Sequence, residues 1–253
     1  FKNKLRNQIQ EKVQKEFPNS ILDIQFLVSK SIKNIVAIAS GKGGVGKSTI
    51  SSNLAISLKN KGYKVGLIDG DIYGPSIPLM FDAENEKPKK IQKGQQFFMS
   101  PVVSYGIKIM SIGFFSKPGD AIIWRGPMAT KALKEIVDNT DWGELDYLLI
   151  DLPPGTGDIH LSIVQTLSIT GVIIITTPQP VSIIDAKKAI NMFKNKSINI
   201  PIIGIVENMS WLLIGNEKHY VFGQDGGKSL AEVEDVQLLL ELPLHQTIRE
   251  AGD

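Results

Sequence analysis

A glycine-rich stretch near residue 41 carries the clearest chemistry in the sequence. Residues 41–48 fit the pattern G-x-x-x-x-G-K-[ST] and directly follow the apolar run 35–39. Glycines let the backbone curl so that successive N–H groups point at phosphate oxygens, while Lys47 supplies an ammonium and Ser48 a hydroxyl for Mg²⁺. The stretch therefore predicts a binding site for ATP and Mg²⁺. Its predicted contact residues are Gly41, Lys42, Gly43, Gly44, Val45, Gly46, Lys47, Ser48 and Thr49.

Acidic residues follow two other apolar segments. Asp151 ends the run 147–150, and this Walker B pattern predicts a buried strand that presents one carboxylate to Mg²⁺. Asp69 and Asp71 follow the segment 64–68. The carboxyl ends of parallel strands form the ligand crevice of an open α/β sheet, where an acidic group can hold Mg²⁺ through water or position an attacking water. Capping of a turn is the alternative for Asp69 and Asp71, and a strand followed by an ordinary turn is the alternative for Asp151.

Four further residues follow predicted strands or begin a helix. Gly155, after two prolines, can bring its N–H towards a γ-phosphate. Asn208 follows the segment 202–206, and its amide offers the donor and acceptor that suit an adenine edge, with a turn-forming role as the alternative. Pro243 ends another predicted strand and is a weaker candidate to border the base. His160 lies in the predicted helix 159–167, where a surface or packing role is favoured over catalysis.

The elements that must position these residues alternate along the chain. Strands are predicted at 35–39, 64–68, 97–103, 107–114, 147–150, 172–178 and 202–206, and helices at 48–61, from after Met128 through Val137, at 159–167 and at 182–196. The polar residues 82–96 predict a solvated excursion. This order predicts an α/β P-loop NTPase domain over residues 31–253, with a mainly parallel sheet sandwiched by helices. Residues 1–30 offer one helix and one strand, too little for a core, and are interpreted as the remnant of a small N-terminal α+β domain.

Composition narrows the classes of partner. The 253 residues are 42% hydrophobic and 21% charged, with 28 basic and 26 acidic side chains and a formal net charge of +2. Because the only compact basic cluster is at 87–90, charge predicts no nucleic-acid or membrane surface. No run of 18 apolar residues and no signal-like segment occurs, so a cytoplasmic location is expected. The chain has no cysteine, which excludes a disulfide or a thiolate metal site made by this chain.

The glycine loop contains Lys42 in addition to Lys47 and reads K-G-G-V-G-K-S. This stretch resembles the deviant Walker A family, which includes the nitrogenase iron protein, MinD, ParA and the Mrp-type iron–sulfur carriers. The motifs D-x-Y-G-P-S, W-R-G-P-M, D-L-P-P-G-T-G-D and V-E-N-M-S are similar to the Mrp branch. The resemblance implies ATP hydrolysis coupled to opening and closing of a homodimer. It implies that Lys42 reaches the partner's nucleotide, that Lys42 and Lys47 stabilise phosphate charge, and that Asn208 contacts the base. Asp71 then matches the family's water-positioning residue, with Asp69 nearer the metal; a solvated loop lysine is the alternative for Lys42.

One departure from the resemblance concerns the iron–sulfur cluster. Many Mrp-type carriers have a Cys-x-x-Cys after the residue matching Asn208, whereas residues 211–221 here contain no thiol, and a lone His219 cannot replace thiolate ligands. The cluster is thus implied by the family alone. The resemblance implies an iron–sulfur cluster carrier or assembly factor that serves apo iron–sulfur proteins or other assembly factors. A MinD- or ParA-like positioning ATPase and a phosphotransferase resembling dethiobiotin synthetase are the alternatives.

Overall fold

The computed structural model describes residues 11–13, 15, 17, 32–71, 74–94, 96–115, 126–250 and 252. It separates into the units Phe1–Ser31 and Ile32–Asp253. The predicted strand 22–28 lies outside the described residues, as do Trp124 and Arg125 of the W-R-G-P-M motif and most of the predicted helix 4–17. The assignment of residues 1–30 to a small α+β domain therefore stays a prediction.

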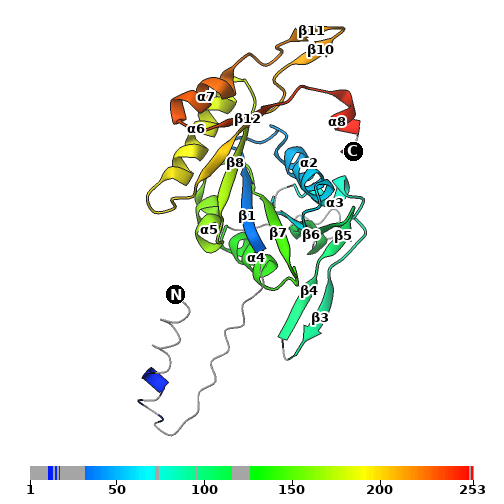
Figure 1. Ribbon diagram of the computed structural model, residues 1–253, viewed down its shortest axis with the longest axis vertical. Coiled ribbons are helices and arrows are strands. Elements are labelled where there is room, and N and C mark those ends of the chain that lie inside the picture. Colours follow the sequence, from blue (N-terminus) through cyan, green and yellow to red (C-terminus); the bar gives the residue numbers. More distant parts are fainter. Residues whose placement is uncertain are drawn as a thin grey trace. The chain divides into compact units, whose positions relative to one another are not determined.

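An eight-stranded sheet forms the centre of the second unit, in the order β12-β9-β8-β1-β7-β2-β6-β5 (Figure 1). Neighbouring strands run parallel except for the pair β5 and β6, so the predicted mainly parallel sheet is confirmed. In chain order the strands are β1 Ile32–Ala39, β2 Val65–Asp69, β5 Val102–Ser104, β6 Ile107–Ser111, β7 Leu145–Asp151, β8 Gly171–Thr176, β9 Ile202–Glu207 and β12 Leu238–Glu241.

Helices cover both faces of this sheet. The helices are α2 Lys47–Asn60, α3 Ile77–Met80, α4 Gly126–Asp138, α5 Asp158–Thr166, α6 Pro180–Lys194, α7 Gly226–Glu234 and α8 Gln246–Glu250. Helices α4, α5, α6 and α7 pack on one apolar cluster, and α2 and α3 pack on the other (Figure 1). The central strand β7 serves both, since Leu148 and Ile150 join the first cluster while Leu149 joins the second. Within the described part of the chain, every helix is too short or too polar to span a lipid bilayer.

Two predictions for the middle of the chain are wrong, and a third is incomplete. The described residues of 82–96 are mostly exposed and lie outside the central sheet, as predicted, but β3 (Lys89–Lys93) pairs with β4 (Gln96–Ser100) in a separate antiparallel hairpin that was not predicted. The predicted strand 97–103 is split at Pro101, which has no N–H to give to a ladder, so β4 and β5 belong to different sheets. The predicted strand 107–114 ends at Ser111, and the 3₁₀ turn Ile112–Phe115 follows.

A second hairpin follows β9 and was not predicted. It pairs β10 (Leu212–Ile214) with β11 (Glu217–His219) through the two-residue loop 215–216. The hairpin occupies the segment in which Mrp-type carriers often place their cysteines. Leu213 and Ile214 are exposed on it, 48% and 58% respectively.

Candidate nucleotide-binding site

The glycine loop joins the buried end of β1 to the start of α2. Gly46 precedes the helix with φ 83° and ψ 25°, a left-handed conformation in which a side chain would be strained. Gly41 is required for a different reason: a Cβ there would lie 2.0 Å from the backbone oxygen of Asp185 in α6. The loop can take this path only because residues 41 and 46 are glycines. It brings the unpaired N–H groups of the first turn of α2 to the carboxyl edge of the sheet.

Lys47 has a buried ammonium that the protein pairs incompletely. Its side chain is 6% exposed, and Nζ lies 2.8 Å from Oδ2 of Asp151. This contact is an ion pair without hydrogen-bond geometry, and Nζ finds no hydrogen-bond acceptor among the described residues. Buried donors are normally satisfied, because an unpaired one keeps its full desolvation cost. A phosphate oxygen beside the loop would supply the missing acceptor, so Lys47 fits a nucleotide.

Asp151 ends β7 as predicted and collects hydroxyl donors from α2. The fully buried carboxylate accepts hydrogen bonds from Ser48 Oγ (2.6 Å) and Ser51 Oγ (2.7 Å). Hydroxyl and carboxylate oxygens are the ligand types that Mg²⁺ prefers, and Ser48 and Asp151 bring both to one place. Ser51 was missed in the sequence, although it follows Ser48 by three residues and therefore lies on the same side of the helix.

Asp69 lies at the same level on the neighbouring strand, since β2 and β7 pair Asp69 with Asp151. It is fully buried and accepts hydrogen bonds from the N–H groups of Asp71 (3.2 Å) and Ile77 (3.1 Å) and from Ser111 Oγ (3.1 Å). Burial, and then the negative charge of Asp151, raise the pKa of Asp69 to about 7. The turn-forming role left open for Asp69 is therefore present, and its role near the metal stays a prediction.

Asp71 and Lys42 lie at the rim of the site. Asp71 is partly buried, and its N–H donates a hydrogen bond to Oδ1 of Asp69 (3.2 Å). Lys42 is also partly buried, and its carbonyl accepts a hydrogen bond from Ser40 Oγ (2.8 Å). Within the described chain, no carboxylate comes within ion-pair distance of Lys42. A hollow of about 100 Å³ is lined by Lys42, Gly43, Gly44, Val45, Thr177, Gln179, Ser182, Met209 and Phe222.

The remaining predicted contacts are engaged with the protein itself. The N–H of Gly155 donates to Ser40 O (3.0 Å), so a γ-phosphate would have to displace that bond. Asn208 is 8% exposed and donates from Nδ2 to Val45 O (2.9 Å), which ties the end of β9 to the glycine loop. Pro243 lies beside that segment, because Leu242 N–H and Leu244 N–H, on either side of it, donate to Glu207 O and Trp211 O. Asn208 and Pro243 therefore lie near each other, and their contact with a base stays a prediction.

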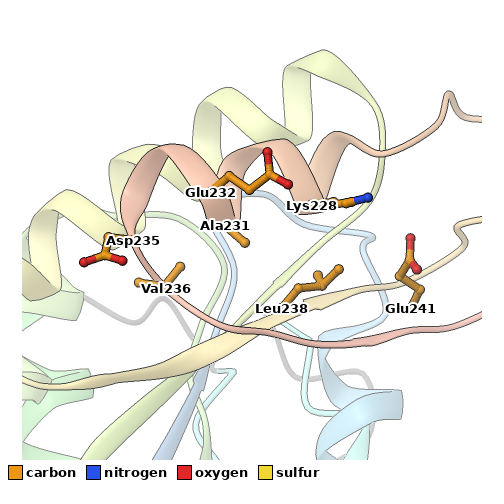
Figure 2. Close-up of a pocket in the computed structure, with 7 residues that line it drawn as sticks. All are labelled: Lys228, Ala231, Glu232, Asp235, Val236, Leu238 and Glu241. Carbon is orange, nitrogen blue, oxygen red and sulfur yellow. The ribbon is translucent and has the colours of Figure 1, made fainter.

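A larger hollow of about 420 Å³ lies elsewhere, between α7 and the edge strand β12 (Figure 2). Lys228 and Glu232 extend from the helix, and Leu238 and Glu241 belong to the strand. None of the predicted site residues lines it. Across the described ranges, no group of three or more His, Cys, Asp or Glu residues is arranged to hold a metal ion.

The raised pKa of Asp69 predicts how stability depends on pH when no nucleotide or metal is added. The folded state keeps the proton on Asp69 up to about pH 7, whereas the ordinary pKa of an aspartate side chain is 3.8. Between these values the folded state binds more protons than the unfolded chain, so the free energy of unfolding contributed by Asp69 falls as the pH rises. The difference in Tm between wild type and Asp69→Asn should therefore change across this window. The exposed control Asp235→Asn should follow wild type at every pH; parallel curves for Asp69→Asn would contradict the assignment.

The chain is similar to known proteins over the residues that carry this site. A family model described as NUBPL iron-transfer P-loop NTPase, of the ParA group, matches residues 31–253. The iron–sulfur cluster carrier protein of Escherichia coli is 48% identical over 224 residues, which are 88% of this chain and 59% of that relative. The iron–sulfur cluster transfer protein NUBPL of Dictyostelium discoideum is 47% identical over 227 residues, which are 88% of this chain and 69% of the relative. The chain thus spans less than two thirds of the Escherichia coli protein.

Solved structures show the same fold. The nucleotide-binding protein of Archaeoglobus fulgidus, determined in complex with ADP, is 36% identical with a TM-score of 0.74, over 87% of this chain and 85% of that one. The cell division ATPase MinD of Pyrococcus furiosus is 22% identical with a TM-score of 0.60, over 87% and 86% of the two chains, and this likeness concerns the fold alone. The chain belongs to the NUBPL iron-transfer P-loop NTPase family.

Proposed function

We propose that this chain binds ATP with Mg²⁺ and hydrolyses it, as a homodimer that serves iron–sulfur cluster assembly. The observation that carries the proposal is the buried group of Lys47, Ser48 and Asp151, in which the lysine lacks a hydrogen-bond acceptor. A structural ion pair would satisfy its own donors. A phosphate would supply the acceptor that Lys47 Nζ lacks, and a divalent cation would supply positive charge beside Asp151 to balance that phosphate.

The residues divide the reaction between them. Water attacks the γ-phosphorus, the bond to the β,γ-bridging oxygen breaks, and ADP and inorganic phosphate leave. Lys47 and the backbone N–H groups of the glycine loop hold the phosphates, and Asp71 orients the water. Ser48 and Asp151 would hold Mg²⁺, with Asp69 near them, and the bound ion would neutralise phosphate charge. Lys42 reaches across to the nucleotide of a second copy and stabilises charge there.

The role in cluster assembly rests on the family and on the names of its members. The relatives are named iron–sulfur cluster carrier or transfer proteins. These 253 residues contain no cysteine, so thiolate ligands for a cluster come from outside them. We therefore propose a carrier or assembly factor whose nucleotide cycle acts on apo iron–sulfur proteins, with the thiolates supplied from outside residues 1–253.

Replacing Lys47 tests the nucleotide site. Lys47→Ala should weaken binding of ADP and of ATP with Mg²⁺ by about a hundredfold, because the variant removes a buried partner of the phosphates and leaves Asp151 unpaired. Isothermal titration calorimetry measures both constants. Lys59→Ala removes an exposed lysine from the same helix and should bind as wild type does. Equal affinities for wild type and a folded Lys47→Ala protein would refute the site.

Lys42 tests the homodimer. Wild type should become dimeric when ATP and Mg²⁺ are added, as read by light scattering, and should turn ATP over. Lys42→Ala should bind ADP as wild type does but lose about a thousandfold in kcat, the size of effect seen when a cation supplied in trans is removed. If Lys42→Ala keeps full turnover and the same mass change with ATP, the lysine does not act across an interface.

Transfer of clusters tests the assembly role separately. Under anaerobic conditions with iron and sulfide, cluster formation on apo-aconitase should be faster when this chain and ATP are both present than with either alone. The enzymatic activity of aconitase measures how much cluster has formed. The Lys47→Ala protein is the matched control, because it should lack the ATP-dependent part of the rate. An equal rate with and without the chain would remove the assembly role while leaving ATP hydrolysis intact.

A further inference from the structure

A buried histidine in the first turn of α5 is hydrogen-bonded to the loop that follows Asp151. His160 is 4% exposed, and its Nε2 lies 2.6 Å from the carbonyl oxygen of Pro153. A carbonyl oxygen only accepts hydrogen bonds, so Nε2 carries the hydrogen in this contact. The surface alternative considered for His160 is therefore wrong, and the packing alternative is too narrow.

The other ring nitrogen fixes the protonation state. Nδ1 is buried and has no hydrogen-bond partner within the described residues. A hydrogen on Nδ1 would be a buried donor without an acceptor, which is costly. Burial lowers the pKa of His160, and the charge of Lys47 lowers it further, against opposing contributions from the Pro153 contact and Asp71. The ring is thus neutral, with its single hydrogen directed at Pro153.

The loop at 153–157 is held from two sides. On one side, Leu152 N–H donates to Ile38 O (3.0 Å) and Gly155 N–H to Ser40 O (3.0 Å), which attach the loop to the end of β1. On the other side is His160, whose bond is the only side-chain hydrogen bond to residues 152–157 in the described chain. The ring also borders Gly155, since a Cβ on that glycine would lie 3.7 Å from Cε1 of His160.

We propose that His160 is a positioning residue for the hydrolysis reaction, acting by anchoring the backbone at Pro153 while the N–H of Gly155 turns from Ser40 O to the γ-phosphate. The inference rests on the proposed function, because it assigns a part in ATP turnover. It reaches the reaction through the loop and not through contact with the nucleotide. The α- and β-phosphates would lie on the glycine loop, and within the described residues the side chain of His160 is hydrogen-bonded to Pro153 and not to that loop. Loss of the bond should therefore slow turnover while leaving ADP affinity unchanged.

Three variants separate this role from simple packing. His160→Leu removes the donor, His160→Asn keeps an amide too short to reach the carbonyl, and His160→Gln places its Nε2 near the original nitrogen. The His160→Leu and His160→Asn variants should lower kcat by roughly ten- to a hundredfold, because a small displacement at a reacting centre has an effect of this size. Their Kd for ADP should stay within about twofold of the wild-type value. The His160→Gln variant should recover most of the wild-type rate. The exposed His219→Leu is the control and should match wild type.

Equal kcat for His160→Leu and wild type would overturn the proposal. So would equal losses in kcat and ADP affinity, or no difference between Gln and Asn, since these outcomes indicate packing alone. If wild type hydrolyses no ATP at all, the proposed function fails, whereas a hydrolysing wild type with an unaffected His160→Leu variant refutes only the role of His160.

A measurement on the unmodified ring does not depend on whether these variants fold. The chain has three histidines, so ¹⁵N–¹H spectra of the imidazoles contain three sets of signals. Gln variants of the exposed His219 and His245 assign two of them and leave α5 unchanged. The third should show the neutral tautomer with hydrogen on Nε2 at neutral pH. A hydrogen on Nδ1, or a doubly protonated ring at pH 7, would overturn the contact on which the proposal stands.

Discussion

The site depends on one carboxylate buried at the end of a central strand. Asp151 is fully buried, yet it receives the ammonium of Lys47 and the hydroxyls of Ser48 and Ser51. A lone buried charge would be too costly, so α2 must stay docked on the sheet for β7 to end in an ionised group. The glycine loop follows from this constraint. It has to turn the chain within a few residues so that the helix presents Lys47, Ser48 and Ser51 to the strand.

A second carboxylate makes the same edge sensitive to charge. Asp69 and Asp151 lie opposite each other on paired strands, and the negative charge of Asp151 helps to raise the pKa of Asp69. Above about pH 7 Asp69 also becomes negative, so that two buried carboxylates lie at this edge with the single ammonium of Lys47. The pairing of two parallel strands thus places both carboxylates at the edge where we propose that Mg²⁺ binds.

The sequence predicted what depends on local pattern. The glycine loop, the strand that ends in Asp151 and the alternation of strands and helices follow from short motifs and apolar runs, and the structure has them. Ser51 and the bond from His160 to Pro153 were missed, because a serine in a helix and a histidine after a loop have no pattern that specifies their partners. The split at Pro101 was missed for a related reason: apolar residues on both sides suggested one strand, whereas the missing N–H ends pairing there. Only the contact of Ser51 with Asp151 is distant in sequence; the other two points depend on single residues, His160 and Pro101.

The hydrogen bond between Asn208 and Val45 has a consequence for selectivity. One amide, directly after β9, is hydrogen-bonded to the glycine loop. A base that accepted from this same amide would take the hydrogen bond away from Val45, so occupancy of the base position and the shape of the phosphate loop would be thermodynamically linked through a single side chain. Binding of the base would then change the conformational freedom of the phosphate loop. A polyphosphate without a base would bind while the bond from Asn208 to Val45 is still in place.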